Sequence, residues 1–173
     1  MLDLVSRNNS TSLLILLLHF FLFFSTDGNG LKGELPEEIK VFSSLESFKI
    51  FFNGVGGTIP DVLSALTSLK IFNIENNEFS GPPVVDLSGL TGLESYRVSN
   101  NTLAGTISES VMQLTSLKEL WMSDNFISGT ISSQIGQLTN LETLFLYRNI
   151  FISGTIPSEI GLLSLKREFM CGM

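Results

Sequence analysis

The sequence is poor in the residues that most catalytic and metal sites use. It contains one histidine, His19, and one cysteine, Cys171, in 173 residues. A single cysteine cannot form a disulfide within the chain, and His19 stands inside an apolar run, so neither residue predicts a reactive site. No phosphate-binding glycine loop and no HRD or DFG kinase triplet occurs. We therefore expect a protein that is not an enzyme, holds no metal and needs no cofactor.

Basic residues are also scarce. The chain has 10 lysines and arginines against 17 acidic residues, which gives a net charge of −7. A protein that binds nucleic acid needs a basic surface for the phosphates, and a protein that binds an anionic membrane by charge needs one as well. We therefore expect no nucleic-acid partner, and a membrane link only through a region that is missing from this chain.

The sequence is instead dominated by a repeat of 24 residues. Its clearest copy runs from Leu117 to Asn140 and reads LKELWMSDNFISGTISSQIGQLTN. An asparagine recurs in six copies, and we call this set the ladder asparagines: Asn29, Asn53, Asn77, Asn101, Asn125 and Asn149. A glycine follows each of them, at Gly33, Gly57, Gly81, Gly105, Gly129 and Gly154.

The pattern inside one copy predicts a short strand followed by a turn. Leu120 and Met122 are two residues apart and face the same side of a strand, whereas Trp121 faces the other. The amide of Asn125 can bond the backbone of its own turn and of neighbouring turns, so the ladder asparagines are predicted to be structural. Gly129 allows a backbone conformation or a close approach that a side chain would prevent.

These motifs resemble the plant-type leucine-rich repeat. The strongest matches are the segments 57–60, 128–131 and 153–157, and the resemblance covers roughly residues 21 to 163. It implies an α/β fold: a right-handed solenoid with a short parallel concave sheet, and short helical turns and extended segments on the convex side. Ectodomains of receptor-like kinases and receptor-like proteins, and secreted inhibitors of cell-wall hydrolases, are built this way.

The N-terminal region has two interpretations. Residues 13–24 form an apolar run of twelve residues that only His19 interrupts. This length suits the apolar segment of a signal peptide and is shorter than the roughly twenty residues of a membrane-spanning helix. The rival interpretation places Phe21, Phe24 and Thr26 in the first strand of the solenoid. We favour the first interpretation, in which residues 1–26 form a signal peptide, residues 27–163 form the repeats and residues 164–173 form an irregular tail.

No capping segment is recognisable at either end of the repeats. The missing caps predict self-association at these ends and are compatible with a fragment of a receptor-like kinase.

The candidate binding residues are the outward-facing ones of each strand. Positions four and two residues before each ladder asparagine should line the concave sheet, where neighbouring strands lie about 4.8 Å apart. Exposed aromatic residues together with arginine are typical of the centre of a protein interface. The predicted binding set is Lys49, Phe51, Glu75, Arg97, Trp121, Phe145, Tyr147 and Arg148.

One N-glycosylation sequon lies in the body of the chain, at Asn100-Asn-Thr102. Asn8 and Asn9 also match the sequon, but they lie in the segment that a signal peptidase would remove. The predicted function is a non-catalytic module that recognises a protein or peptide ligand on its concave face, either secreted or displayed at the cell surface. The alternative is a cytoplasmic interaction scaffold whose N-terminal apolar run forms the first strand.

Overall fold

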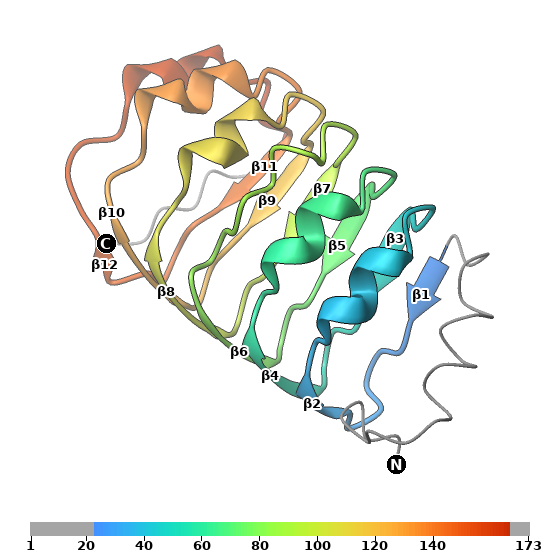
Figure 1. Ribbon diagram of the computed structural model, residues 1–173. Helices are drawn as coiled ribbons and strands as arrows, with labels where there is room; N and C mark the ends of the chain where they lie inside the picture. Colours follow the sequence, from blue (N-terminus) through green and yellow to red (C-terminus); the bar gives the residue numbers. More distant parts are fainter. Residues whose placement is uncertain (1–22, 167–173) are drawn as a thin grey trace, which may run out of the picture.

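A computed structural model describes residues 23–166, which coil into a solenoid with a parallel sheet along each of two sides (Figure 1). The first sheet has the strand order β1-β3-β5-β7-β9-β11, and the second has the order β12-β10-β8-β6-β4-β2. The strands of the first sheet are β1 (Phe23–Ser25), β3 (Ser47–Lys49), β5 (Ile71–Asn73), β7 (Ser95–Arg97), β9 (Glu119–Trp121) and β11 (Thr143–Phe145). Those of the second are β2 (Lys32–Glu34), β4 (Gly54–Thr58), β6 (Glu78–Gly81), β8 (Thr102–Thr106), β10 (Phe126–Gly129) and β12 (Phe151–Ile152).

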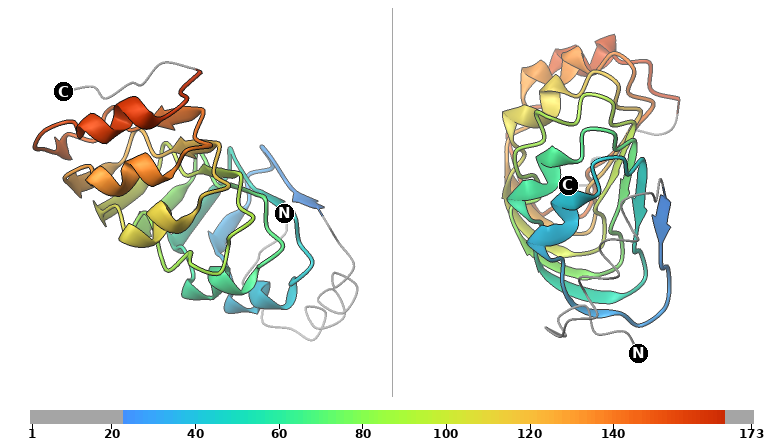
Figure 2. Two further views of the ribbon diagram at one scale, coloured as in Figure 1. Left: turned by 90° about the horizontal axis from the view of Figure 1, so that it is seen from above. Right: turned by 45° about the vertical axis from the view of Figure 1, so that its right-hand side comes forward.

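Short 3-10 helices lie on the side away from the first sheet (Figure 2). They are η1 (Glu37–Val41), η2 (Asp61–Ala65), η3 (Glu109–Gln113), η4 (Ser133–Gln137) and η5 (Ser158–Leu162). None of the helices between residues 23 and 166 is long and apolar enough to cross a membrane. The parallel sheets and the short 3-10 helices confirm the solenoid class that the repeat predicted.

The register of the first sheet follows the sequence period. Phe48 pairs with Phe72, Tyr96 with Leu120, and Leu120 with Leu144, so each residue lies beside the residue 24 positions later. Equivalent side chains consequently form columns along the solenoid. Leu120 and Leu144 are buried, while Trp121 beside them is half-buried on the opposite face. This confirms the strand phase that the alternation predicted.

The core changes character along its length. In the first half, Phe24, Phe48, Phe72 and Tyr96 form a continuous stack, with ring centroids 5.3–5.7 Å apart and the ring planes nearly parallel. In the second half, leucines occupy the same column. Each stacked aromatic pair adds about 0.5–1.5 kcal/mol beyond the burial of its apolar area.

The ladder asparagines tie successive turns together. Asn101 Nδ2 donates to the carbonyls of Ile74 and Val98 at 3.0 and 3.1 Å, and Asn101 Oδ1 accepts from the backbone N–H of Phe79 at 2.9 Å. The same bonds recur at Asn125. Asn29 differs, because it is exposed, and its Nδ2 donates to the carbonyl of Asp27 among the described residues.

The second sheet was not predicted as a sheet. The sequence indicated extended segments on the convex side, and these segments pair with each other in register (Figure 1). The glycine that follows each ladder asparagine has a positive φ, 84° at Gly129, and a Cβ there would lie 2.9 Å from Thr106 Cγ2. Both the backbone conformation and the close approach therefore require glycine.

The repeat that begins Gly81-Pro82-Pro83 departs from the others. Between η2 and η3 the described chain forms no 3-10 helix, and a gap separates the two groups of helices in Figure 1. Proline fixes its own φ and restricts the residue before it, so two prolines hold this segment extended. The freed carbonyl of Pro83 accepts a hydrogen bond from the hydroxyl of buried Tyr96 at 2.9 Å. This bond satisfies a polar group in the core.

The N-terminal apolar run overlaps the solenoid at its end. Phe23–Ser25 form β1, which pairs with β3, and Phe24 stacks on Phe48 at 5.3 Å. His19 and Phe21, like Asn8, Asn9 and Cys171, lie outside the described residues. Cleavage of a signal peptide and the domain limits stay predictions.

Candidate binding face

An open hollow of about 320 Å³ lies on the first sheet, near its C-terminal end. It spans the ends of the strands from β5 to β11, so four successive repeats contribute to it. Because the repeats are in register, residues far apart in the sequence meet here in three parallel columns. The hollow is lined by Glu75, Asn76, Ser99, Asn100, Trp121, Ser123, Asp124, Phe145, Tyr147 and Arg148.

Three aromatic rings form one wall of the hollow. The Trp121 and Phe145 centroids are 5.0 Å apart with planes tilted by 41°, and Tyr147 meets Phe145 edge-on at 5.9 Å. All three side chains are half-buried. The rings support one another, so the wall is already ordered without a ligand, which lowers the entropic cost of binding.

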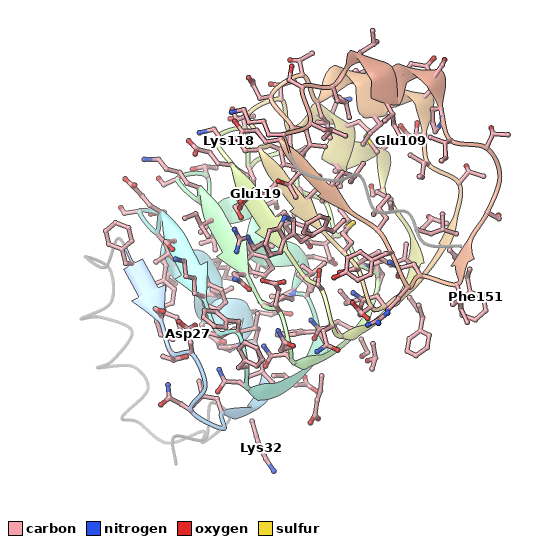
Figure 3. All side chains as sticks on the ribbon, turned by 180° about the vertical axis from the view of Figure 1, so that it is seen from behind. Asp27, Lys32, Glu109, Lys118, Glu119 and Phe151 are labelled. Carbon is pink, nitrogen blue, oxygen red and sulfur yellow. The ribbon has the colours of Figure 1, made fainter. Side chains whose placement is uncertain are left out.

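Arg97 holds the indole ring from the neighbouring strand β7, and Glu119 of β9 fixes the position of Arg97. The guanidinium carbon of Arg97 lies 3.9 Å from the Trp121 ring centroid. Its Nε and Nη2 donate to Glu119 Oε2 at 3.1 and 2.7 Å, and the Ser95 hydroxyl donates to the same oxygen at 2.7 Å. Figure 3 shows Glu119 among the side chains of this sheet. The cation is thereby neutralised beside the hollow and does not line it.

Glu75 brings a carboxylate to the hollow from the repeat of β5, the first of the four repeats that line it. Burial raises the pKa of the Glu75 carboxyl above its usual range, and the charge of Arg97 partly offsets this effect. No ion pair reaches Glu75 within the described residues. The backbone N–H of Glu75 donates to Asn73 Oδ1 at 3.0 Å, which fixes the course of the chain beside it.

A column of residues in the left-handed conformation forms the edge of the hollow. Asn76, Asn100, Asp124 and Arg148 each have φ near 54° and directly precede a ladder asparagine. Arg148 Nη1 donates to Asp124 Oδ1 at 3.0 Å, and Asn100 Nδ2 donates to Asn76 Oδ1 at 2.5 Å. The hydrogen bond and charge of Asp124 raise the pKa of the Arg148 guanidinium, so this exposed cation is paired.

A second line of charges runs along the sheet away from the hollow. Acidic and basic residues alternate over six repeats, and the ion pairs are Lys70–Glu46 at 2.8 Å, Lys118–Glu94 at 2.8 Å and Lys166–Glu142 at 2.5 Å. Hydrogen bonds with Glu46 and Glu94 raise the pKa of the Lys70 and Lys118 ammonium groups. Such exposed pairs contribute little to stability. The alternation at a period of 24 was present in the sequence and was missed.

The predicted binding set divides into three groups. Glu75, Trp121, Phe145, Tyr147 and Arg148 line the hollow. Arg97 lies behind the indole ring. Lys49 and Phe51 lie outside the hollow, and Phe51 packs edge-on against Phe52 at 5.6 Å.

Ser99 and Ser123 line the hollow and stand in a column that was predicted to line the concave sheet, although neither was in the predicted binding set. The sequence analysis did not select three further polar groups at this face, Asn76, Asp124 and Glu119. The position directly before each ladder asparagine would have indicated Asn76 and Asp124, because it repeats at the same period. Residues 23–166 contain no group of three potential metal ligands. The arrangement offers ordered aromatic area, hydrogen-bonding groups and one unpaired carboxylate.

The class of protein follows from the repeated strands, the asparagine ladder and the 3-10 turns. A family model described as leucine-rich repeats (2 copies) matches residues 115–159. The chain is a leucine-rich-repeat protein, and it is structurally similar to the ectodomains of plant receptor kinases. No significant match was found among curated proteins.

Three solved structures illustrate this similarity. The Arabidopsis receptor kinase HAESA, in complex with the peptide hormone IDA and the co-receptor SERK1, is 33% identical over 83% of this chain and 24% of its own, with a TM-score of 0.75. The plant peptide hormone receptor RGFR1, in complex with RGF2, is 31% identical over 83% of this chain and 23% of its own, with a TM-score of 0.75. The ectodomain of SOBIR1 from Arabidopsis thaliana is 25% identical over 78% of this chain and 72% of its own, with a TM-score of 0.71. The chain thus spans less than a quarter of HAESA and RGFR1.

Proposed function

We propose that this protein is a non-catalytic recognition module that binds an extended peptide or protein segment in the hollow of its first sheet. The observation that carries the proposal is the wall of Trp121, Phe145 and Tyr147. Trp121 and Phe145 lie on the outward side of strands whose inward side already forms the core, and Tyr147 follows the second of these strands, so folding alone does not require the rings there. Preordered aromatic residues surrounded by polar groups are typical of interface hot spots.

The polar groups around the wall suit the backbone of an extended ligand. Asn76, Asn100 and Ser123 line the hollow and provide donors and acceptors for peptide N–H and C=O groups. Two of the similar structures, HAESA and RGFR1, hold peptide hormones, which supports this ligand class. The unpaired carboxylate of Glu75 favours ligands without an acidic group at that point.

The proposed location is outside the cell or at its surface. The apolar run over residues 13–24 has the length of a signal peptide, and the similar SOBIR1 structure is a receptor ectodomain. A second copy is a further proposed partner, because large apolar side chains are exposed at the C-terminal end of the solenoid.

A peptide-display selection on the immobilised chain tests the recognition role. Peptides that bind the wild type should lose affinity for the variant Trp121→Ala, Phe145→Ala, Tyr147→Ala. The matched control is Phe126→Ala with Phe151→Ala, which removes two exposed aromatic rings from the second sheet. Selected peptides that bind the triple variant and the wild type equally would refute the proposed site.

The alternative function is a cytoplasmic interaction scaffold, and β1 is the observation that favours it. Phe24 continues the aromatic stack of the core, so removal of residues 1–26 would expose the face of Phe48. Sequencing the N-terminus of the mature protein separates the two functions. A chain that starts after residue 26 excludes the scaffold, and a chain that retains residues 1–26 excludes secretion by cleavage.

A further inference from the structure

We infer that Asn100 is a modification site at which an N-linked glycan closes the hollow, so that a glycan and an extended ligand exclude each other. The inference rests on the proposed passage through the secretory pathway. It joins two observations that have separate origins: the sequon at 100–102 and the place of Asn100 at the edge of the hollow.

The folded chain presents both functional residues of the sequon at the surface. Asn100 and Thr102 are exposed, whereas Asn101 between them is buried as a ladder asparagine. Asn100 has a φ of 54°, a conformation that asparagine tolerates better than most residues, and it is exposed to solvent. A bulky group on Asn100 therefore requires no rearrangement of the solenoid.

The hydrogen bonds of Asn100 are compatible with the modification. In the glycosylation reaction, the molecule that donates the sugar is an activated sugar diphosphate. A bond forms between Asn100 Nδ2 and the anomeric carbon, the bond from that carbon to the diphosphate oxygen breaks, and one proton leaves Nδ2. Nδ2 carries two hydrogens, and within residues 23–166 it makes one hydrogen bond, to Asn76 Oδ1 at 2.5 Å. The glycosylated amide keeps one N–H, which can still donate to Asn76.

The consequence for the hollow follows from its lining. Asn100 borders the same space as Trp121, Ser123 and Tyr147, and it lies in the middle of the edge column between Asn76 and Asp124. A branched sugar chain fixed at this point lies over the mouth of the hollow. The neighbouring edge positions, Asn76 and Asp124, do not lie in sequons, so the modification is confined to one position of this column.

The single tryptophan of the chain provides a direct test, because Trp121 lines the hollow. The full chain is produced in a secreting eukaryotic host, and the peptide that contains Asn100 is examined by mass spectrometry. Acrylamide quenching of Trp121 fluorescence is then measured before and after enzymatic removal of the glycan. Removal converts Asn100 to Asp, so the matched control is Asn100→Asp produced in a host that does not glycosylate.

We expect Asn100 to be glycosylated, and we expect quenching of Trp121 to be weaker with the glycan than without it. The deglycosylated protein and Asn100→Asp should then be quenched equally. Thr102→Ala should abolish glycosylation, and Thr102→Ser should retain it along with the hydroxyl that donates to the Phe79 carbonyl at 2.8 Å.

Three outcomes would overturn the inference. A secreted, folded chain with unmodified Asn100 would refute glycosylation at this position, and the proposed recognition of peptides would still stand. A glycan that leaves quenching unchanged shows that the sugar points away from the hollow. A chain retained in the cytoplasm overturns the inference together with the proposed location.

Discussion

The guanidinium of Arg97 stacks on the indole of Trp121 at 3.9 Å while it donates two hydrogen bonds to Glu119. The three side chains come from two neighbouring strands, β7 and β9, and they set the orientation of the ring that forms the centre of the aromatic wall. Order at the binding face is therefore maintained by residues that do not all line the hollow.

Arg97→Lys should disturb this arrangement, because an ammonium lacks the planar surface that stacks on the ring. We expect a loss of about 0.5–1 kcal/mol of stability and a shift of Trp121 fluorescence. The control is Lys70→Met, which breaks an exposed ion pair with Glu46 and should leave the fluorescence unchanged. Equal spectra for Arg97→Lys and the wild type would contradict the stacking role.

Replacing Trp121, Phe145 and Tyr147 with alanine should leave the far-UV circular dichroism intact and lower the melting temperature only slightly. These residues lie outside the core, and they lose mainly their contacts with each other. The matched set Leu120, Leu144 and Leu146 is buried in the core, with the first two on the inward side of β9 and β11 and Leu146 directly after β11. Each alanine there should cost about 2–5 kcal/mol through the cavity that it leaves. Equal unfolding of both sets would contradict the strand phase.

Asn101→Leu should destabilise the middle repeats. The side chain is 8% exposed and satisfies the carbonyls of Ile74 and Val98 and the N–H of Phe79. Each buried backbone group that loses its partner costs about 1–3 kcal/mol, which a urea denaturation curve measures. Asn29→Leu is the control, because Asn29 occupies the same column but is exposed. We expect it to change stability little, so similar losses at both positions would show that the ladder is not the cause.

Glu75→Gln should raise the melting temperature at pH 7 and have no effect at pH 3. Burial raises the pKa of Glu75 in the folded state, so the folded protein binds this proton more tightly than the unfolded chain does. The resulting stabilisation is fully present below the unfolded pKa, roughly 4.3, and is lost as the pH rises through the folded pKa. Glutamine cannot ionise, so the variant does not lose this stabilisation as the pH rises. A glutamine variant that is less stable than the wild type at pH 7 would show that the charged form is favoured.

Asp86 provides a control of the opposite sign. A hydrogen bond from the backbone N–H of Ser88 lowers the pKa of the Asp86 carboxyl. Its stabilisation is present above the unfolded pKa and is lost as the pH falls through the folded pKa. Asp86→Asn should therefore lower the melting temperature at pH 7 more than at pH 3.

The isolated chain should self-associate through its C-terminal end. Ile150, Ile156 and Leu162 are 76%, 58% and 67% exposed, and Phe151 projects from β12 at the edge of the molecule (Figure 3). Apolar residues grouped at an open sheet edge favour association. Sedimentation velocity should show the wild type as oligomers and Ile156→Lys with Leu162→Gln as a smaller species. Phe126→Gln, at an exposed position of β10, is the control, and a monodisperse wild type would contradict the prediction.

The sequence alone determined the columns. A period of 24 residues places Trp121 beside Phe145 in the sheet and puts Leu120 and Leu144 behind them, because parallel strands in register align equivalent positions. The alternation within each strand assigned these residues to opposite faces. The role of the ladder asparagines followed from the same period, since buried backbone groups at a strand end need a partner in every turn.

Only the tertiary structure decided which members of the columns meet. Arg97 was predicted as a binding residue, but it turns toward Glu119 and stacks on Trp121 instead of lining the hollow. Lys49 lies in the same column and is remote from the hollow, whereas Asp124 and Asn76 join its edge. The physical reason is that the period fixes the backbone position of each residue. The direction of a long side chain depends on the charge, ring or hydrogen-bond partner that the neighbouring repeat offers.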